Sequence, residues 1–264
     1  SRSANKSTVY EVFILFNDLS IENRAFIARS IHDLPNLILK FIDCREFFTK
    51  GHETRGITSS TYLRLWAPVV LPTYKKILYA DVDIIFLEDL TKLYQWDIGD
   101  SCFAGVKSPP PRQRYSMQKG WGDSYINAGV LIINCEKITH DDIDTCSKLA
   151  AKNKFEFQDQ DIINSVFKGR KYCDIPQRYN FSPSALKRLL VSGHTNKIDI
   201  AVIHYIGAKP WNQNVLLGEF WWKEFTNCSF FDFDWYIKYC ENLKKGPPLK
   251  IATRLFLKAL FRAR

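Results

Sequence analysis

The sequence predicts an α/β protein whose sheet is mixed but mostly parallel, with helices on its flanks. Two patterns indicate this class. Runs rich in β-branched and aromatic residues alternate with stretches of helical spacing along the chain. Several of these runs, such as INAGVLIINC at 126–135, are apolar almost throughout, which is typical of strands covered on both faces. With 264 residues, of which 46% are hydrophobic, the chain can bury one large core.

The first third of the chain contains three expected strands and two expected helices. SIENRAFIARSIHDL at 20–34 has helical spacing, and Ser20 is a suitable N-cap. TSSTYLRLWAPVVLP at 58–72 has the same spacing and is stopped by Pro72. The expected strands are TVYEVFILF (8–16), NLILKFIDC (36–44) and KKILYAD (75–81).

The rest of the chain continues the alternation. QDQDIINSVFKG at 158–169 is expected to be a helix that ends at Gly169. The segment VKSPPPRQR at 106–114 is basic and rich in proline, so we expect it to resist helix formation. The further expected strands are CFAGVK (102–107), INAGVLIINC (126–135) and IAVIHYIG (200–207).

Charge and cysteine content limit the classes of function. A formal net charge of +9 favours an acidic partner, such as a nucleotide, a phosphorylated glycan, an anionic membrane or nucleic acid. The alternative is a basic protein without such a partner. Nucleic acid is disfavoured because the aromatic residues lie mostly in apolar runs. The seven cysteines include no CxxC pair, which argues against a zinc knuckle and for reduced thiols in the cytosol. No run of 18 apolar residues predicts a membrane span.

The stretch ILYADVDIIFLEDL at 77–90 places two aspartates directly after an apolar run. Ligands of open α/β sheets bind at the carboxyl ends of strands, and residues two apart on an extended chain face the same side. Asp81 and Asp83 can therefore converge on one hard cation, for which Mg²⁺ or Mn²⁺ fits the oxygen ligands. The alternative is a surface turn with two solvated carboxylates.

Further motifs follow in order along the chain: SSTYLRL (59–65), YADVDIIFLEDL (79–90), YINAGVLIIN (125–134), FQDQDIIN (157–164) and HYIGAKPW (204–211). With these motifs the chain resembles, from about Ile21 to Trp211, the retaining nucleotide-sugar glycosyltransferases of family 8. It is most similar to the bacterial galactosyl- and glucosyltransferases of lipopolysaccharide core assembly. The resemblance implies a GT-A fold, with one Rossmann-like sheet that binds a UDP-sugar.

The resemblance also implies a metal site. Asp81, Asp83 and His204 would ligate Mn²⁺ or Mg²⁺, which bridges the diphosphate of the donor and stabilises the charge of the departing UDP. Lys209 would add a second positive contact to that phosphate. The family usually has one more residue between the histidine and the lysine. For His204 the alternative is a core histidine that is satisfied by hydrogen bonds.

Further residues are assigned to the donor sugar by the resemblance. Arg64 would help to hold the donor, with a surface salt bridge as the alternative. Asn127 and Asp159 would hydrogen-bond sugar hydroxyls, and Gln160 would lie beneath the anomeric carbon. The donor contacts implied by the resemblance are Arg64, Asp81, Val82, Asn127, Ala128, Asp159, Gln160, Gly207 and Lys209, with Gln160 and Asp159 as the catalytic pair.

A retaining transfer needs a covalent intermediate or attack from the face that the leaving group vacates. Because a glutamine amide is a poor nucleophile, same-face attack is favoured, with Gln160 stabilising positive charge on the sugar. The leaving phosphate oxygen would then deprotonate the acceptor. The alternative for Asp159 and Asp161 is a structural role, because aspartates favour the first turn of a helix.

Two features depart from the family pattern. About 25 residues of the expected domain, including a strand and loop that hold uracil, are absent by comparison with relatives. The chain is therefore expected to be truncated, or to have lost part of its nucleotide site. Where relatives often carry an acceptor-side aspartate, this chain has the basic segment 106–114. That segment favours an acceptor with negative charge, such as a phosphorylated heptose; a solvated loop is the alternative.

The last 18 residues, PPLKIATRLFLKALFRAR at 247–264, form a basic amphipathic pattern. Lys250, Arg254, Lys258 and Arg262 recur every four residues, with apolar residues on the other faces. This pattern favours a helix on an anionic membrane surface, and the alternative is a helix docked on the core. We therefore expect a transferase domain over 1–228 and a membrane-association segment over 229–264.

The combined prediction is a metal-dependent hexosyltransferase. It would move glucose or galactose, with retention, from a UDP-sugar to lipopolysaccharide or another lipid-linked glycan. It would be cytoplasmic and peripheral on the inner face of the bacterial plasma membrane. The alternatives are a glycogenin-like priming transferase and a catalytically impaired scaffold that binds nucleotide sugars.

Overall fold

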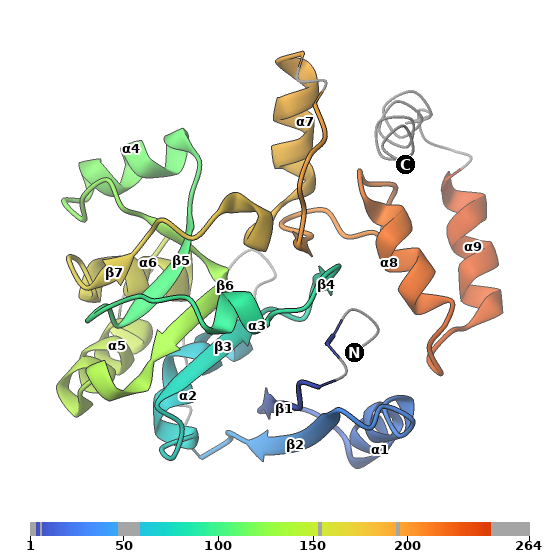
Figure 1. Ribbon diagram of the computed structural model, residues 1–264, viewed down its shortest axis with the longest axis horizontal. Coiled ribbons are helices and arrows are strands. Elements are labelled where there is room, and N and C mark those ends of the chain that lie inside the picture. Colours follow the sequence, from blue (N-terminus) through green and yellow to red (C-terminus); the bar gives the residue numbers. More distant parts are fainter. Residues whose placement is uncertain (1–3, 6, 47–58, 153–154, 194–195, 244–264) are drawn as a thin grey trace. The chain divides into compact units, whose positions relative to one another are not determined.

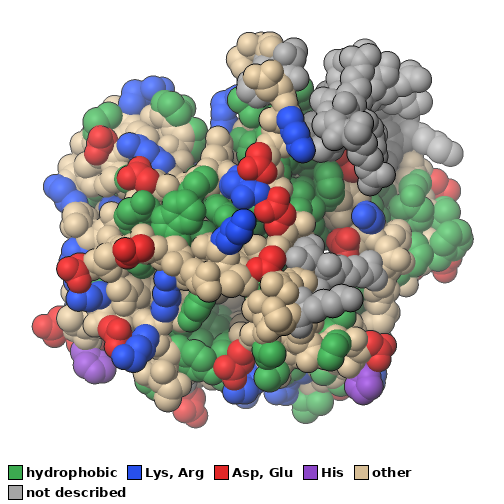
Figure 2. Space-filling model, viewed as in Figure 1, with side chains coloured by type: hydrophobic (Ala, Val, Ile, Leu, Met, Phe, Trp, Pro, Cys, Tyr) green, Lys and Arg blue, Asp and Glu red, His purple; other side chains and the backbone are tan. Residues whose placement is uncertain are grey.

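The computed structural model describes residues 4–5, 7–46, 59–152, 155–193 and 196–243 (Figure 1). The described chain forms two compact units. Of the described residues, the first unit comprises those up to Ala80 and those from Leu90 to Gln177, and the second comprises Asp81–Asp89 and those from Arg178 to Leu243. Basic and acidic side chains are intermingled over the face in Figure 2. No helix among the described residues is long and apolar enough to cross a membrane.

The first unit contains a four-stranded sheet in the order β3-β6-β5-β7. The central strand β6 pairs in antiparallel fashion with β3 and with β5, whereas β5 and β7 are parallel. The strands are β3 (Lys76–Ala80), β5 (Phe103–Lys107), β6 (Ile126–Asn134) and β7 (Lys171–Tyr172).

A separate two-stranded parallel sheet in the same unit is formed by β1 (Tyr10–Phe16) and β2 (Leu37–Asp43). The helix α1 (Ile21–Ser30) connects them, as a parallel pair requires. The predicted N-cap is confirmed, because the Ser20 hydroxyl accepts a hydrogen bond from the Asn23 N–H at 3.1 Å.

Helices pack against the sheet of the first unit. The core includes buried residues of β5, β6 and α6, and Phe103 of β5 meets Phe167, just after α6, edge to face with ring centroids 4.7 Å apart. The predicted helix end at Gly169 is three residues too late, because α6 ends at Val166 and Gly169, with its positive φ, lies in the turn that follows. The helical elements of this part of the chain are η1 (Ser59–Tyr62), α2 (Leu63–Val70), α3 (Thr91–Tyr94), α4 (Pro110–Gln118), η2 (Cys135–Lys137), α5 (His140–Lys152) and α6 (Gln158–Val166).

The second unit is built on an antiparallel pair, β4 (Ile84–Phe86) and β8 (Val202–His204). Its core is apolar and includes Phe181, Leu186, Ile203, Tyr205 and Leu217. An aromatic cluster joins its last two helices, which pack through several tryptophan and tyrosine rings. The helical elements are η3 (Gln177–Asn180), α7 (Pro183–Val191), α8 (Gly218–Phe225) and α9 (Phe233–Leu243).

The α/β class with a mixed sheet is confirmed, but the sheets are less parallel than the sequence indicated. Among the described strands, β3/β6, β5/β6 and β4/β8 are antiparallel, and β1/β2 and β5/β7 are parallel. β6 is apolar almost throughout because both of its faces are buried. The alternation of strands and helices predicted the α/β class correctly, but it does not specify the direction of each strand.

The prediction that 106–114 resists helix formation was also wrong. The helix α4 begins inside this segment, with Pro109 as an extended N-cap residue and prolines in its first turn. A proline in the first turn removes an N–H that has no partner within the helix, and its fixed φ suits the helix. The predicted amphipathic helix at 247–264 lies outside the described residues, so it stays a prediction.

Candidate functional site

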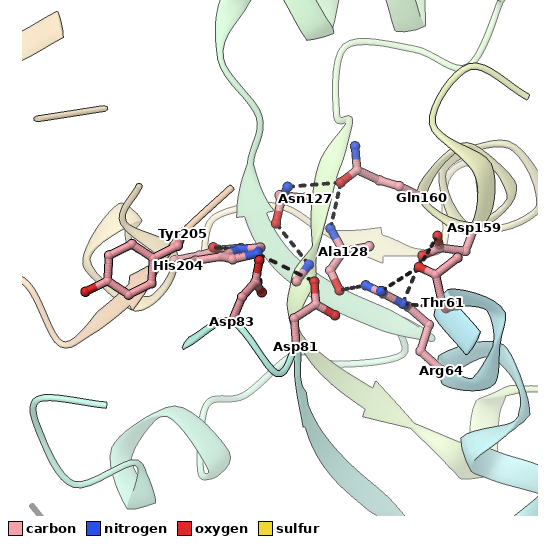
Figure 3. A network of polar contacts seen from close by, with 12 residues as sticks. Thr61, Arg64, Asp81, Asp83, Asn127, Ala128, Asp159, Gln160, His204 and Tyr205 are labelled. Atoms are coloured by element: carbon pink, nitrogen blue, oxygen red, sulfur yellow. Dashed lines mark hydrogen bonds and ion pairs between the residues drawn. The ribbon is translucent and has the colours of Figure 1, made fainter. Parts of the chain in front are cut away.

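Three predicted metal ligands meet in the second unit. Asp81 and Asp83 lie just before β4, and His204 is the last residue of β8 (Figure 3). The β4/β8 register places Ile84 opposite His204, which brings the preceding Asp83 beside the imidazole. The His204 Nε2 lies 3.2 Å from Asp83 Oδ1 and 3.5 Å from Asp81 Oδ2. One ligand atom from each residue lies within 4.8 Å of the others, so the group can hold a metal ion.

The orientation of His204 suits metal ligation. Its ring is buried, and its Nδ1 is 2.8 Å from the Oδ1 of Asn180. An Nδ1–H group would donate to that oxygen and leave Nε2, which faces the two carboxylates, available to a metal ion. Metal-bound histidines are commonly fixed in this way by a partner on the other ring nitrogen. The sequence did not single out Asn180, which follows no recognisable motif.

Lys209 binds the same carboxylate cluster. Its ammonium contacts Asp83 Oδ2 and donates to the backbone oxygen of Tyr205 at 2.8 Å. The turn between His204 and Lys209 passes through Gly207, whose φ of +83° suits a glycine. The lysine therefore reaches the cluster despite the shortened spacing. Burial raises the pKa of Asp83, but His204 and Lys209 outweigh it and lower that pKa to about 2.

Val82 differs from its neighbours. Its side chain is fully exposed, whereas Asp81 and Asp83 on either side contribute to the cluster. The structure therefore does not bring this side chain to the three ligands. The assignment of Val82 to the donor stays a prediction.

A second polar cluster lies in the first unit. Arg64 on α2 and Asp159 on α6 form a buried ion pair, with Arg64 Nε 2.9 Å from Asp159 Oδ2. The Thr61 hydroxyl donates to Asp159 Oδ1 at 2.8 Å, and Arg64 Nη1 donates to the Ala128 carbonyl at 2.5 Å (Figure 3). Because both charged groups are buried, the alternative of a surface salt bridge for Arg64 is excluded.

Gln160 is anchored to the head of β6. Its Oε1 accepts hydrogen bonds from Asn127 Nδ2 and from the Ala128 N–H, both at 3.0 Å (Figure 3). Asn127 Oδ1 in turn accepts from the Gly129 N–H at 2.9 Å. The buried Gln158 starts α6 with a φ of +44°, an unusual conformation for a residue with a side chain. Such backbone outliers cluster at functional sites.

The structure therefore arranges the predicted site residues in two clusters, one in each unit. The first unit holds the Arg64, Asn127, Ala128, Asp159 and Gln160 cluster, and the second holds Asp81, Asp83, His204, Gly207 and Lys209. Sequence reasoning missed Thr61, Tyr125 and Asn180, which position these residues through side-chain hydrogen bonds. The only signal for Tyr125 was its place at the start of the motif YINAGVLIIN.

Residues 2–215, well over half of the chain, match the model of the family described as Glycosyl transferase family 8. The chain belongs to this family. The resemblance that the sequence motifs indicated is thereby confirmed.

The fold comparison agrees with family 8 membership. The galactosyltransferase LgtC, solved with donor and acceptor sugar analogs, is 28% identical with a TM-score of 0.74. The match covers 90% of this chain and 92% of LgtC. The apo bifunctional glycosyltransferase WbbM also has a TM-score of 0.74, at 23% identity, over 92% of this chain and 48% of that one, which supports the fold alone. The expected GT-A fold is thus confirmed.

The curated relatives include bacterial glycosyltransferases. Glycosyltransferase GlyE of Streptococcus pneumoniae is 30% identical over 210 residues, which cover 74% of this chain and 48% of GlyE. A lipopolysaccharide 1,2-glucosyltransferase of Escherichia coli K12 is 28% identical over 174 residues, which cover 61% of this chain and 51% of that protein. The chain spans about half of the length of these two relatives.

Proposed function

We propose that the protein is a retaining family 8 hexosyltransferase that uses a UDP-sugar, a divalent cation and a glycan acceptor. The observation that carries this proposal is the convergence of Asp81, Asp83 and His204 on one point. The residues fit a hard divalent cation, because two carboxylates and one imidazole whose Nε2 faces them offer suitable ligand atoms.

The second-unit cluster would receive the diphosphate of the donor. A cation held by the three ligands would stabilise the negative charge that develops on departing UDP. Asp83 stays ionised at neutral pH, since its pKa lies near 2. Lys209, which now neutralises Asp83, brings a further positive charge to the same place. Gly207 supports that arrangement through its turn.

The first-unit cluster would receive the transferred sugar. Arg64 and Thr61 hold both oxygens of Asp159, so the carboxylate presents a fixed acceptor to a sugar hydroxyl. Asn127 and Gln160 lie beside each other at the head of β6. A glutamine amide is a poor nucleophile, and Asp159 is neutralised by its partners. These features favour attack on the same face, with the leaving phosphate oxygen as the base.

The acceptor would be a lipid-linked glycan, and the donor sugar glucose or galactose. The lipopolysaccharide glucosyltransferase among the relatives supports this choice. So does the basic segment 106–114, which contributes Lys107, Arg112 and Arg114 without an acidic residue. We propose that residues 1–228 carry transfer, and that 229–264 attach the protein to the cytoplasmic face of the membrane.

The experiment measures UDP release and sugar transfer from UDP-glucose and UDP-galactose, with Mn²⁺, with Mg²⁺ and with EDTA. Purified lipopolysaccharide and soluble glycans serve as competing acceptors. Asp83→Asn should abolish turnover, and Asp141→Asn, an exposed aspartate on α5, is the matched control. Donor binding without turnover in the wild-type chain would favour the impaired scaffold. Transfer to soluble glycan alone would favour a priming transferase.

A further inference from the structure

A buried hydrogen-bond chain runs behind Gln160. The Gln160 Nε2 donates to the Tyr125 hydroxyl at 3.1 Å, and that hydroxyl donates to Asp161 Oδ1. Both Tyr125 and Asp161 are completely buried. The other carboxylate oxygen of Asp161 accepts from the Tyr115 hydroxyl and from the Phe157 N–H, each at 2.9 Å. The proposed transfer reaction gives this buried carboxylate no role.

The donor and the acceptor of each of these hydrogen bonds are determined by the groups at the two ends of the series. The Ala128 N–H at one end and the Phe157 N–H at the other are backbone groups that can only donate. The Asp161 carboxylate can only accept, so the Tyr125 hydroxyl must point its proton at Asp161 and accept from Gln160. Burial, followed by the charge of Asp161, raises the pKa of Tyr125, which keeps the hydroxyl protonated.

We propose that Tyr125 and Asp161 are positioning residues that hold the Gln160 amide from behind, with its carbonyl oxygen on the Asn127 side. This inference rests on the proposed function, in which Asn127 and Gln160 meet the donor sugar. The carbonyl end of the amide, rather than its NH₂ end, then faces the sugar. A negative dipole end at that place stabilises positive charge that develops on the anomeric carbon.

Loss of the Tyr125 hydroxyl removes the partner of the Gln160 NH₂ group. The donor would be left unpaired in a half-buried position, and the side chain would swing to find another acceptor. Displacing a reacting group by about 1 Å costs on the order of 100-fold in rate. The binding of the diphosphate by the second-unit cluster needs no contribution from Gln160, so substrate affinity should change little.

The Asp161→Asn substitution tests the direction of these hydrogen bonds. The asparagine oxygen must take the Phe157 N–H, which cannot reverse, so the new NH₂ group must face Tyr125. The Tyr125 hydroxyl then accepts from residue 161, and its proton points at the Gln160 NH₂. The Tyr125 hydroxyl and the Gln160 NH₂ group would then point protons at each other. Gln160 would be displaced, although asparagine has the same shape as aspartate.

Tyr115→Phe provides a matched control for Tyr125→Phe. Each change removes one hydroxyl donor from the same carboxylate, but only Tyr125 contacts Gln160. We expect Tyr125→Phe and Asp161→Asn to lower kcat about 10- to 100-fold, with the KM for the UDP-sugar changed less than about threefold. Tyr115→Phe should keep kcat within about threefold of the wild type, with a similar loss of stability.

A second readout does not require activity. The side-chain NH₂ protons of Gln160, assigned by NMR with a Gln160→Asn variant, should exchange slowly in the wild type and in Tyr115→Phe. They should exchange faster in Tyr125→Phe and in Asp161→Asn. If the Tyr115→Phe and Tyr125→Phe variants have equal kcat and equal exchange rates of the Gln160 NH₂ protons, the inference is overturned. It is also overturned if Asp161→Asn has the kcat and the exchange rate of the wild type. An inactive wild type with the expected exchange pattern would refute the proposed function, but it would support the positioning of Gln160 by Tyr125 and Asp161.

Discussion

The buried ion pair of Arg64 and Asp159 makes the sharpest prediction about stability. The two side chains are only 7% and 6% exposed. Arg64→Met removes the cation, its bond to the Ala128 carbonyl and its bonds to Thr61, and leaves the buried Asp159 carboxylate without its paired cation. Removing one partner of a buried pair costs about 3–5 kcal/mol, because an uncompensated charge remains.

Urea unfolding measures this loss as a shift of the midpoint, and Arg178→Met is the control. Arg178 also pairs with two carboxylates, Glu88 and Asp199, but these are 48% and 68% exposed. An exposed pair contributes about 0.2–1 kcal/mol. Adding Asp159→Asn to Arg64→Met should recover part of the lost stability. If Arg64→Met costs no more than Arg178→Met, the reasoning about the buried pair is refuted.

Three further predictions concern single residues in the first unit. Burial lowers the pKa of Lys171 to about 8, so between pH 8 and the ordinary lysine pKa of 10.5 the unfolded chain binds more protons than the folded one. Stability should therefore rise with pH over that window, and the difference between the wild type and Lys171→Met, followed by urea unfolding, should show this rise; a flat difference contradicts it. Asn164→Ala should cost at least about 2 kcal/mol, because the side chain bonds both the N–H and the carbonyl of the buried Ile126. An unchanged melting temperature for this variant would contradict that account. Ser20→Ala removes the cap of α1 and should cost about 1 kcal/mol in denaturant unfolding, whereas a neutral effect would show that the cap does not stabilise the protein.

The sequence predicted the parts of the fold that depend on local pattern. The Ser20 cap, the helix at α6 and the strand that leads to His204 all follow from residue type and spacing. The approach of Asp81 and Asp83 to His204 was predicted from family motifs, because no local pattern links residues more than 100 positions apart.

The sequence missed features that depend on tertiary pairing. The direction of β6 relative to β3 and β5 is set by the connections between them, and apolar character reports only burial. The prolines of 106–114 were interpreted as helix breakers, although their effect depends on where the helix starts. Asn180 and Tyr125 were overlooked because each acts through one side-chain bond to a residue that is distant in sequence.

The most direct test of the account is Mn²⁺ binding, followed by electron paramagnetic resonance in the presence of UDP. The wild type should bind one Mn²⁺, and His204→Ala should weaken that binding by about tenfold or more, since it removes one of the three candidate ligands. His140→Ala, which removes an exposed histidine on α5, should bind as the wild type does. Equal Mn²⁺ affinity in the two histidine variants would contradict the assignment of the metal site.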